Sequence, residues 1–171
     1  MIKINLAKHT DAAVLALLGR ITYAESHGNF IDSKDDLSTY INDAFSVAKT
    51  KQDINNTKNL FYMLFVDDLP VGYAKLVVNA VHESVLSPNN CRLERIYILS
   101  DFIPLKIGQQ LLTFVEEKVK ELQLDTLWLS VYIQNNRAIR FYKRNKFKNV
   151  GELNFIVNGK EFENIVFSKK L

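Results

Sequence analysis

The stretch that decides the fold runs from Arg92 to Phe147 and reads RLERIYILSDFIPLKIGQQLLTFVEEKVKELQLDTLWLSVYIQNNRAIRFYKRNKF. Its first segment, Arg92–Leu99, alternates as a strand does, and Leu105 to about Leu122 has the spacing of an amphipathic helix. A buried strand over Leu127–Ile133 and a short helix from Asn136 to about Asn145 follow. The stretch therefore predicts strands joined by helices, with polar residues at the junctions where an anionic ligand could bind.

Two helices are predicted before this stretch, after a short strand over residues 2–6. The first extends from Asp11 to about Gly28, and its apolar residues on one side are Val14, Leu17, Leu18 and Ile21. The second is expected to be capped by Ser33 or Asp32. Its helically spaced apolar positions are Leu37, Tyr40, Ile41, Ala44, Phe45 and Ala48.

Two strand pairs complete the expected fold. Leu60–Val66 and Pro70–Val78 are joined by a turn at Asp67–Asp68, and late strands near 147–157 and 162–168 are joined at Asn158–Gly159. The order β-α-α-β-β-β-α-β-α-β-β predicts an α/β (α+β) fold, with a mixed sheet and helices on both faces. The length of 171 residues fits a single domain over 1–171.

Composition indicates a globular protein, with 47% apolar residues. No apolar run approaches the roughly 18 residues that cross a bilayer, and the first residues lack the pattern of a signal peptide. The single cysteine, Cys91, excludes an internal disulfide and fits a reducing compartment. These features predict a soluble, cytoplasmic protein without a membrane partner.

Charge is distributed unevenly, although the net charge of +3 is too small to indicate nucleic-acid binding. Residues 137–148 hold six cations and no acid, whereas residues 24–43 are rich in acids. One explanation is that both regions are solvated helix faces. The other is that residues 137–148 bind a phosphate-bearing ligand and residues 24–43 attract a cationic one. The residues are Arg137, Arg140, Lys143, Arg144, Lys146 and Lys148, and Glu25, Asp32, Asp35, Asp36 and Asp43.

The junction at Pro104 is a candidate anion site. Proline is tolerated in the first turn of a helix, where the N–H groups have no intrahelical partner. The free amides of residues 106–110 and the positive end of the helix dipole would attract an anion, and Lys106 adds a cation. Every helix has such an end, and Gly108 could serve only close packing.

Three polar side chains are candidates for chemistry. Glu94 shares a strand face with Ile96 and Ile98, so desolvation would make it a better base; from the residues alone, a salt bridge with Arg95 or a lysine at the sheet rim is the favoured explanation. Tyr142 is protonated at pH 7 and could donate a proton, or it is an ordinary half-buried tyrosine. Asn135 could hold a ligand, but capping the following helix is the favoured role.

No metal site is predicted. The three histidines lack the spacing of metal ligands, and the cysteine has no second cysteine nearby.

Taken together, the chain resembles the GCN5-related N-acetyltransferases, the GNAT superfamily, over essentially its whole length. The family's phosphate pattern Gln/Arg-x-x-Gly-x-Gly/Ala corresponds to Ile103-Pro104-Leu105-Lys106-Ile107-Gly108. The pattern Asn-x-x-Ala-x-x-Phe-Tyr is intact as Asn135-Asn136-Arg137-Ala138-Ile139-Arg140-Phe141-Tyr142. Within the superfamily the chain is similar to the PaiA group of polyamine acetyltransferases, through ITYAESHGNF, LERIYI and AIRFYKRNKF.

The resemblance implies the GNAT acyl-CoA N-acyltransferase fold, and direct transfer of an acetyl group from acetyl-CoA to a primary amine such as spermidine or spermine. Pantetheine would lie between splayed parallel strands. Tyr142 would protonate the leaving thiolate, and Glu94 would be the base, through water. Acceptor residues would be Glu25, Asp32 and Glu94. Cofactor residues would be Ile96, Tyr97, Ile98, Ile103, Pro104, Leu105, Lys106, Ile107, Gly108, Gln109, Asn135, Tyr142, Lys143 and Arg144.

The chain departs from the family pattern at three positions. Ile103 replaces Gln/Arg, Lys106 replaces the first glycine, and Lys146 replaces a glycine before Phe147. A helical φ is expected for Lys106, and Asn145 is the expected left-handed residue.

Alternatives stay open for the acceptor and for activity. The acceptor could be a protein N-terminus, a lysine or another small amine such as an amino sugar. The chain could also be a catalytically silent acyl-CoA-binding regulator. No nucleic-acid partner is expected, and a homodimer is possible.

Overall fold

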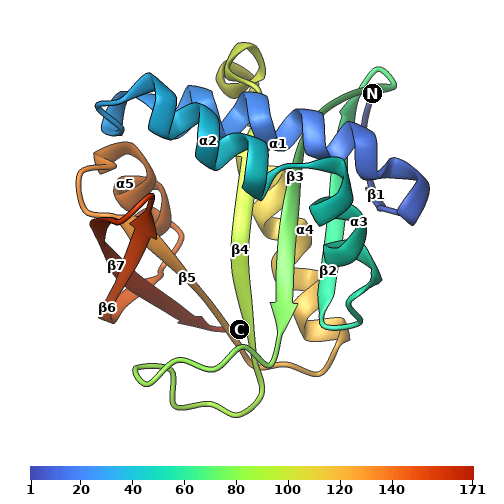
Figure 1. The fold of residues 1–171 in the computed structure, drawn as a ribbon. Helices are drawn as coiled ribbons and strands as arrows, with labels where there is room; N and C mark the ends of the chain where they lie inside the picture. Colours follow the sequence, from blue (N-terminus) through green and yellow to red (C-terminus); the bar gives the residue numbers. More distant parts are fainter. The chain divides into compact units, whose positions relative to one another are not determined.

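Strands and short helices alternate along the chain in a computed structural model that describes residues 1–171 (Figure 1). The strands are β1 (Ile2–Leu6), β2 (Asn59–Val66), β3 (Leu69–Val78), β4 (Asn90–Ile98), β5 (Thr126–Tyr132), β6 (Lys148–Val157) and β7 (Lys160–Lys170). The α-helices are α1 (Ala12–His27), α2 (Lys34–Ala44), α3 (Val47–Asn55), α4 (Ile107–Glu121) and α5 (Asn136–Arg144). Short 3-10 turns are η1 (His9–Asp11), η2 (Gly28–Phe30) and η3 (Ser100–Leu105). The predicted order is confirmed with one helix added, α3.

The seven strands form a mixed sheet in the hydrogen-bonding order β1-β2-β3-β4-β5-β7-β6. β4 and β5 are parallel, whereas β1–β2, β5–β7 and β6–β7 are antiparallel, as an α/β fold of this kind requires. The chain divides into two compact units, residues 1–76 with 95–115 and residues 77–94 with 116–171. A single domain over 1–171 therefore stays a prediction. No helix is long and apolar enough to cross a membrane.

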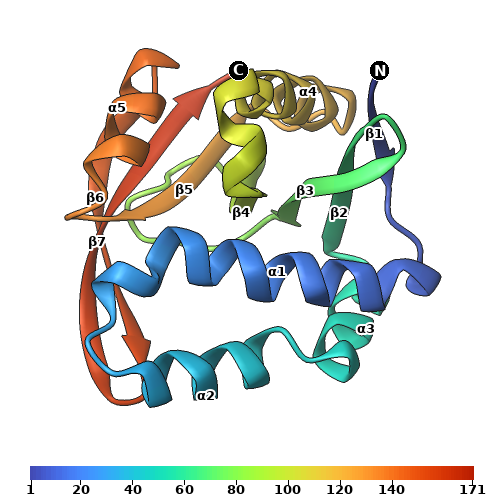
Figure 2. The same cartoon turned by 90° about the horizontal axis from the view of Figure 1, so that it is seen from above.

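In the first unit, α1 and α4 cover opposite faces of the β2–β3 pair (Figures 1 and 2). Tyr62, which points away from α1, packs edge-on against Phe114 of α4, with ring centroids 5.2 Å apart. The cluster under α1 consists of Leu15, Leu18, Phe61, Met63 and Tyr73. Helices on both faces, as predicted, are thus confirmed within this unit.

α1 buries a different side from the apolar stripe noted in the sequence. Val14, Leu17 and Ile21 are exposed, and of that stripe only Leu18 is buried. The buried side contains small residues, and at Gly19 an added Cβ would lie 2.3 Å from Cδ1 of Phe45. The helix therefore uses its small-residue side because only that side permits close approach.

The second predicted helix is two helices, with a break at Phe45. Ser46 starts a new helix, α3, after the break: its side chain accepts a hydrogen bond from the backbone N–H of Lys49 (3.2 Å) and so caps α3. Ser33 caps α2 by accepting from the N–H of Asp36 (3.2 Å). Of the two expected caps, Ser33 is therefore the one used.

Both predicted hairpin turns are confirmed. Asp67 and Asp68 have φ values of 48° and 65°, and Asn158 and Gly159 have values of 47° and 80°. Two consecutive left-handed residues are the conformation that two-residue hairpins require.

In the second unit, β5 is paired unequally on its two edges. Its ladder to β7 covers all of Thr126–Tyr132, whereas its parallel ladder to β4 covers only three pairs, Asn90–Arg92 against Thr126–Trp128. From Leu129 onward, the edge of β5 that is not bonded to β7 lacks a strand partner. Backbone groups there are available to a ligand with amide groups.

Candidate functional site

The turn between β4 and α4 carries the predicted phosphate residues. Ile103, Pro104 and Leu105 lie in η3, which starts after Leu99, and α4 begins only at Ile107. The predicted helix start near Leu105 is therefore two residues early. The helix also ends at Glu121, one residue before the predicted end near Leu122. Leu122 is exposed and does not belong to the buried stripe of the helix.

Lys106 links η3 to α4 in a left-handed conformation, with φ 56° and ψ 20°. The prediction of a helical φ is wrong, because the chain must reverse direction between the 3-10 turn and the helix. Its N–H donates to the carbonyl of Ile103 (3.1 Å), and its carbonyl accepts from the N–H of Gln109 (3.2 Å). A lysine in this conformation costs about 1 kcal/mol relative to glycine.

The first turn of α4 lies against the end of β4. A Cβ at Gly108 would be 3.4 Å from Cδ1 of Ile98, so these two predicted cofactor residues are neighbours. The amides of Ile107 and Gly108 are at the positive end of the helix and have no intrahelical acceptor. The geometry fits an anion at this turn, and Lys106 adds a positive charge to it.

Tyr97 projects to the opposite side of β4, as the alternation predicts. Its ring lies 5.8 Å from that of Tyr73 and 6.4 Å from that of Tyr23, by centroids. Burial raises the pKa of Tyr97 well above its usual value. Because its side chain is packed among other rings, only the backbone of Tyr97 is suited to a ligand. Ile96, the preceding cofactor candidate, is half-buried.

Glu25, expected to bind the acceptor, has a different partner. Its carboxylate accepts hydrogen bonds from both the N–H (2.9 Å) and the hydroxyl (2.8 Å) of Ser100. Glu25 therefore ties the last turn of α1 to the first residue of η3. Asp32 is exposed and precedes the capping residue Ser33.

His27 is a half-buried polar residue whose role its sequence position does not reveal. Its ring stacks on Tyr23 at 4.5 Å, and its Nδ1 lies 2.6 Å from the hydroxyl of Ser26. Burial lowers the pKa of His27 to about 4, so the ring is neutral at physiological pH and is a weak base. The spacing of Tyr23 and His27, one helical turn, was the only signal in the sequence.

Asn135 caps α5 as the local sequence predicts. Its side-chain oxygen accepts from the N–H of Ala138 at 3.1 Å. Its side-chain NH₂ could donate to a ligand.

Tyr142 is buried between Phe141 and Phe147, with ring centroids 5.2 and 5.5 Å away. Burial raises the pKa of its phenol, which is therefore protonated at neutral pH and can act as a proton donor. Glu94 is half-buried, and Lys143 and Arg144 are exposed.

The left-handed residue after α5 is Lys146, with φ 68°, and not Asn145, whose φ is −86°. The prediction for Asn145 is wrong because its side-chain NH₂ donates to the carbonyl of Phe141 (2.9 Å), which keeps it at the helix end. The chain therefore has a left-handed lysine at each of the two positions where it replaces a glycine of the family pattern.

Comparison with known proteins identifies the family. Residues 28–147 match the acetyltransferase (GNAT) family. An uncharacterized N-acetyltransferase of the pepI 3' region of Lactobacillus delbrueckii subsp. lactis is 28% identical over 170 residues, which cover 99% of this chain and 98% of that protein. The spermidine N(1)-acetyltransferase of Thermoplasma acidophilum is 28% identical over 122 residues, 69% of this chain and 71% of that protein.

Solved structures show the same fold. The crystal structure of the PaiA N-acetyltransferase of Thermoplasma acidophilum, in complex with coenzyme A, has a TM-score of 0.77 at 24% identity, over 100% of this chain and 99% of that one. The ribosomal-protein-S18-alanine N-acetyltransferase of Escherichia coli has a TM-score of 0.69 at 17% identity, over 99% of this chain and 94% of that one. The chain belongs to the acetyltransferase (GNAT) family, and the predicted class of enzyme, an N-acetyltransferase, is confirmed.

Proposed function

We propose that the protein transfers an acetyl group from acetyl-CoA, the donor of its family, to a primary amine of a polyamine such as spermidine. The observation that carries the proposal is the early end of the β4–β5 ladder after Arg92 and Trp128, while β5 remains paired with β7. Pantetheine contains two amides, and such a strand edge supplies backbone partners for them. The diphosphate would bind at the amides of Ile107 and Gly108, with Lys106 as the cation.

Two side chains would move protons in the reaction. Glu94, through a water molecule, would take a proton from the ammonium group of the acceptor, so that the free amine attacks the thioester carbonyl carbon. The backbone N–H near Ile96 would polarise this carbonyl. As the carbon–sulfur bond breaks, Tyr142 would donate its phenolic proton to the sulfur. Asn135, Lys143 and Arg144 would contact the donor.

The choice of a polyamine has two supports. The chain is similar to a spermidine N(1)-acetyltransferase, and residues 24–43 have an acidic bias. Because Glu25 binds Ser100, the negative charge for the acceptor would come from Asp32 and Glu94. The similarity to a ribosomal-protein alanine acetyltransferase keeps a protein N-terminus as the second candidate.

A thiol-release assay with acetyl-CoA tests the proposal, with spermidine, an alanine-ended peptide and an aminoglycoside as separate acceptors. Turnover with spermidine at a kcat/KM at least about tenfold above the others is expected, since a long polycation gains from several negative charges. Preference for the peptide would replace the polyamine by a protein substrate. Saturable binding of coenzyme A without turnover on any amine would identify a silent regulator.

A further inference from the structure

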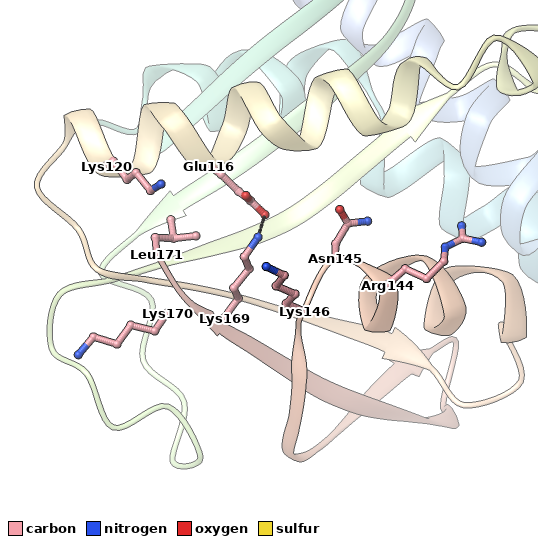
Figure 3. Close-up of a pocket in the computed structure, with 8 residues that line it drawn as sticks. All are labelled: Glu116, Lys120, Arg144, Asn145, Lys146, Lys169, Lys170 and Leu171. Carbon is pink, nitrogen blue, oxygen red and sulfur yellow. Dashed lines mark hydrogen bonds and ion pairs between the residues drawn. The ribbon is translucent and has the colours of Figure 1, made fainter.

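A basic hollow of about 360 Å³ lies in the second unit (Figure 3). It is formed by the second half of α4, the end of α5 and the end of β7. Its lining contains five side-chain cations and one side-chain carboxylate, and the proposed transfer of an acetyl group uses only Arg144 among them. The lining residues are Glu116, Lys120, Arg144, Asn145, Lys146, Lys169, Lys170 and Leu171.

The hollow contains one buried ion pair and one further lysine, Lys146. Lys169 forms an ion pair with Glu116 at 2.6 Å, and both side chains are largely buried, at 19% and 17% exposure. Lys169 is also held over the ring of Phe147 at 5.6 Å. The exposed Lys146 lines the same hollow from the end of α5 (Figure 3) and has no ion-pair partner in the structure. This single ion pair therefore leaves four of the five side-chain cations of the lining without a carboxylate partner in the hollow, so the lining has an excess of positive charge.

The backbone that presents Lys146 is strained. Its φ of 68° is a conformation that glycine adopts freely and lysine does not. The turn is closed by the N–H of Lys146, which donates to Lys143, and by the N–H of Phe147, which donates to Tyr142. Strained residues of this kind cluster at functional sites. The cap of α5 sets this backbone conformation, and the lysine that takes it in place of a glycine adds a cation to the lining of the hollow.

We propose that this hollow binds a small anion that carries two or more phosphate groups. Lys146 and Lys169 would donate hydrogen bonds to its oxygens, and Lys120 and Lys170 would add long-range attraction. Because the anion must compete with Glu116 for Lys169, a multiply charged phosphate is favoured over a single carboxylate or chloride. The volume lies in the range of small-molecule sites, roughly 300–1,000 Å³. Apart from Arg144, its residues have no part in the proposed acetyl transfer.

The test is calorimetric titration of inorganic pyrophosphate into the protein saturated with coenzyme A, at low salt, so that the turn at Lys106 is already filled. Saturable binding at one site is expected. Lys146→Gly removes the ammonium group and relieves the backbone, and should weaken pyrophosphate binding about tenfold. Glu116→Gln releases Lys169 and should strengthen binding. Opposite effects of two variants cannot come from a general loss of stability.

Lys106→Gly is the matched control, because it makes the same substitution at the other left-handed lysine. It should leave pyrophosphate binding to the coenzyme-A complex unchanged. Amide NMR signals of residues 145–147 and 169–171 should shift with pyrophosphate.

No saturable binding in the presence of coenzyme A, or equal affinity in Lys146→Gly, would overturn the inference. A protein that does not bind coenzyme A would refute the proposed function alone, because the NMR shifts still decide whether this hollow binds an anion.

Discussion

The turn that opens α4 and the turn that closes α5 contain the same unusual residue, a left-handed lysine, in opposite settings. Lys106, with φ 56°, precedes a helix whose first amides have no intrahelical acceptor, whereas Lys146, with φ 68°, follows a helix and lines the same hollow as the Lys169–Glu116 ion pair. The first setting attracts an anion mainly through backbone donors, the second through side-chain charge. The comparison teaches that loss of a glycine from a pattern need not remove a site: it adds a cation there at a cost in backbone strain.

The largest expected effect separates the rate of acetyl transfer from the binding of coenzyme A, and so tests whether the two turns have different roles. Tyr142→Phe removes the buried phenol next to the second turn and leaves the first turn intact. The kcat should fall about 100-fold or more, which is the usual contribution of a general acid, while the Kd for coenzyme A stays within about twofold of wild type. Stopped-flow thiol release and calorimetry measure the two quantities. Unchanged kcat would remove Tyr142 from the acid role.

The next largest effect is a pH dependence of stability. It originates at His27, near the end of α1 and two residues after Glu25, which bonds Ser100 of η3. The pKa of His27 is about 4 in the folded protein and near 6.5 in the unfolded chain. The unfolded chain therefore binds the proton more tightly. Stability is complete above pH 6.5 and is lost as the pH falls from 6.5 toward 4, by about 2 kcal/mol at pH 5. Urea unfolding at pH 7.5 and pH 5 measures the loss, and His27→Phe should reduce it; an equal loss in that variant would place the proton elsewhere.

Much of the fold is predictable because its signals are local. The turns at Asp67–Asp68 and Asn158–Gly159 consist of residues that tolerate left-handed backbone, so both hairpins follow from the sequence. The cap at Asn135 is equally local, since its oxygen bonds to an amide three residues later. The family pattern around Tyr142 placed the acid candidate, and the structure adds its burial.

Other features are not predictable, for physical reasons. α1 is apolar on both sides, so periodicity does not show that Leu15 is buried and Leu17 exposed; close approach at Gly19 decides it. The break at Phe45 is hidden because that residue fits the helical spacing. The left-handed conformation of Lys106 is imposed by the reversal between η3 and α4, and lysine gives no sign of it. The ion pair of Lys169 with Glu116 joins residues 53 positions apart, which local patterns do not reveal.

A smaller effect is expected at Glu25. It decides whether this residue anchors η3, which leads into the turn at Lys106, or binds the acceptor. Glu25→Ala removes both hydrogen bonds to Ser100 and should raise the KM for acetyl-CoA about fivefold. Glu25→Gln keeps an oxygen acceptor but removes the charge, and should behave like wild type. A raised KM for spermidine in Glu25→Gln, with that for acetyl-CoA unchanged, would restore the role in acceptor binding.

The smallest effects come from returning each lysine to glycine, and they address the comparison directly. Both Lys106→Gly and Lys146→Gly should raise the free energy of unfolding by up to about 1 kcal/mol, because a positive φ no longer opposes a Cβ. The extra freedom of glycine in the unfolded chain offsets part of this gain. Thermal and urea unfolding measure both variants under one set of conditions.

Binding should separate the two variants where stability does not. Lys106→Gly should weaken coenzyme A about threefold, since the amides of Ile107 and Gly108 remain as donors after one exposed cation is lost. Lys146→Gly should leave the Kd for coenzyme A unchanged. Equal losses of coenzyme A affinity in both variants would mean that the two turns serve one anion, and the distinction between backbone and side-chain recognition would then be wrong.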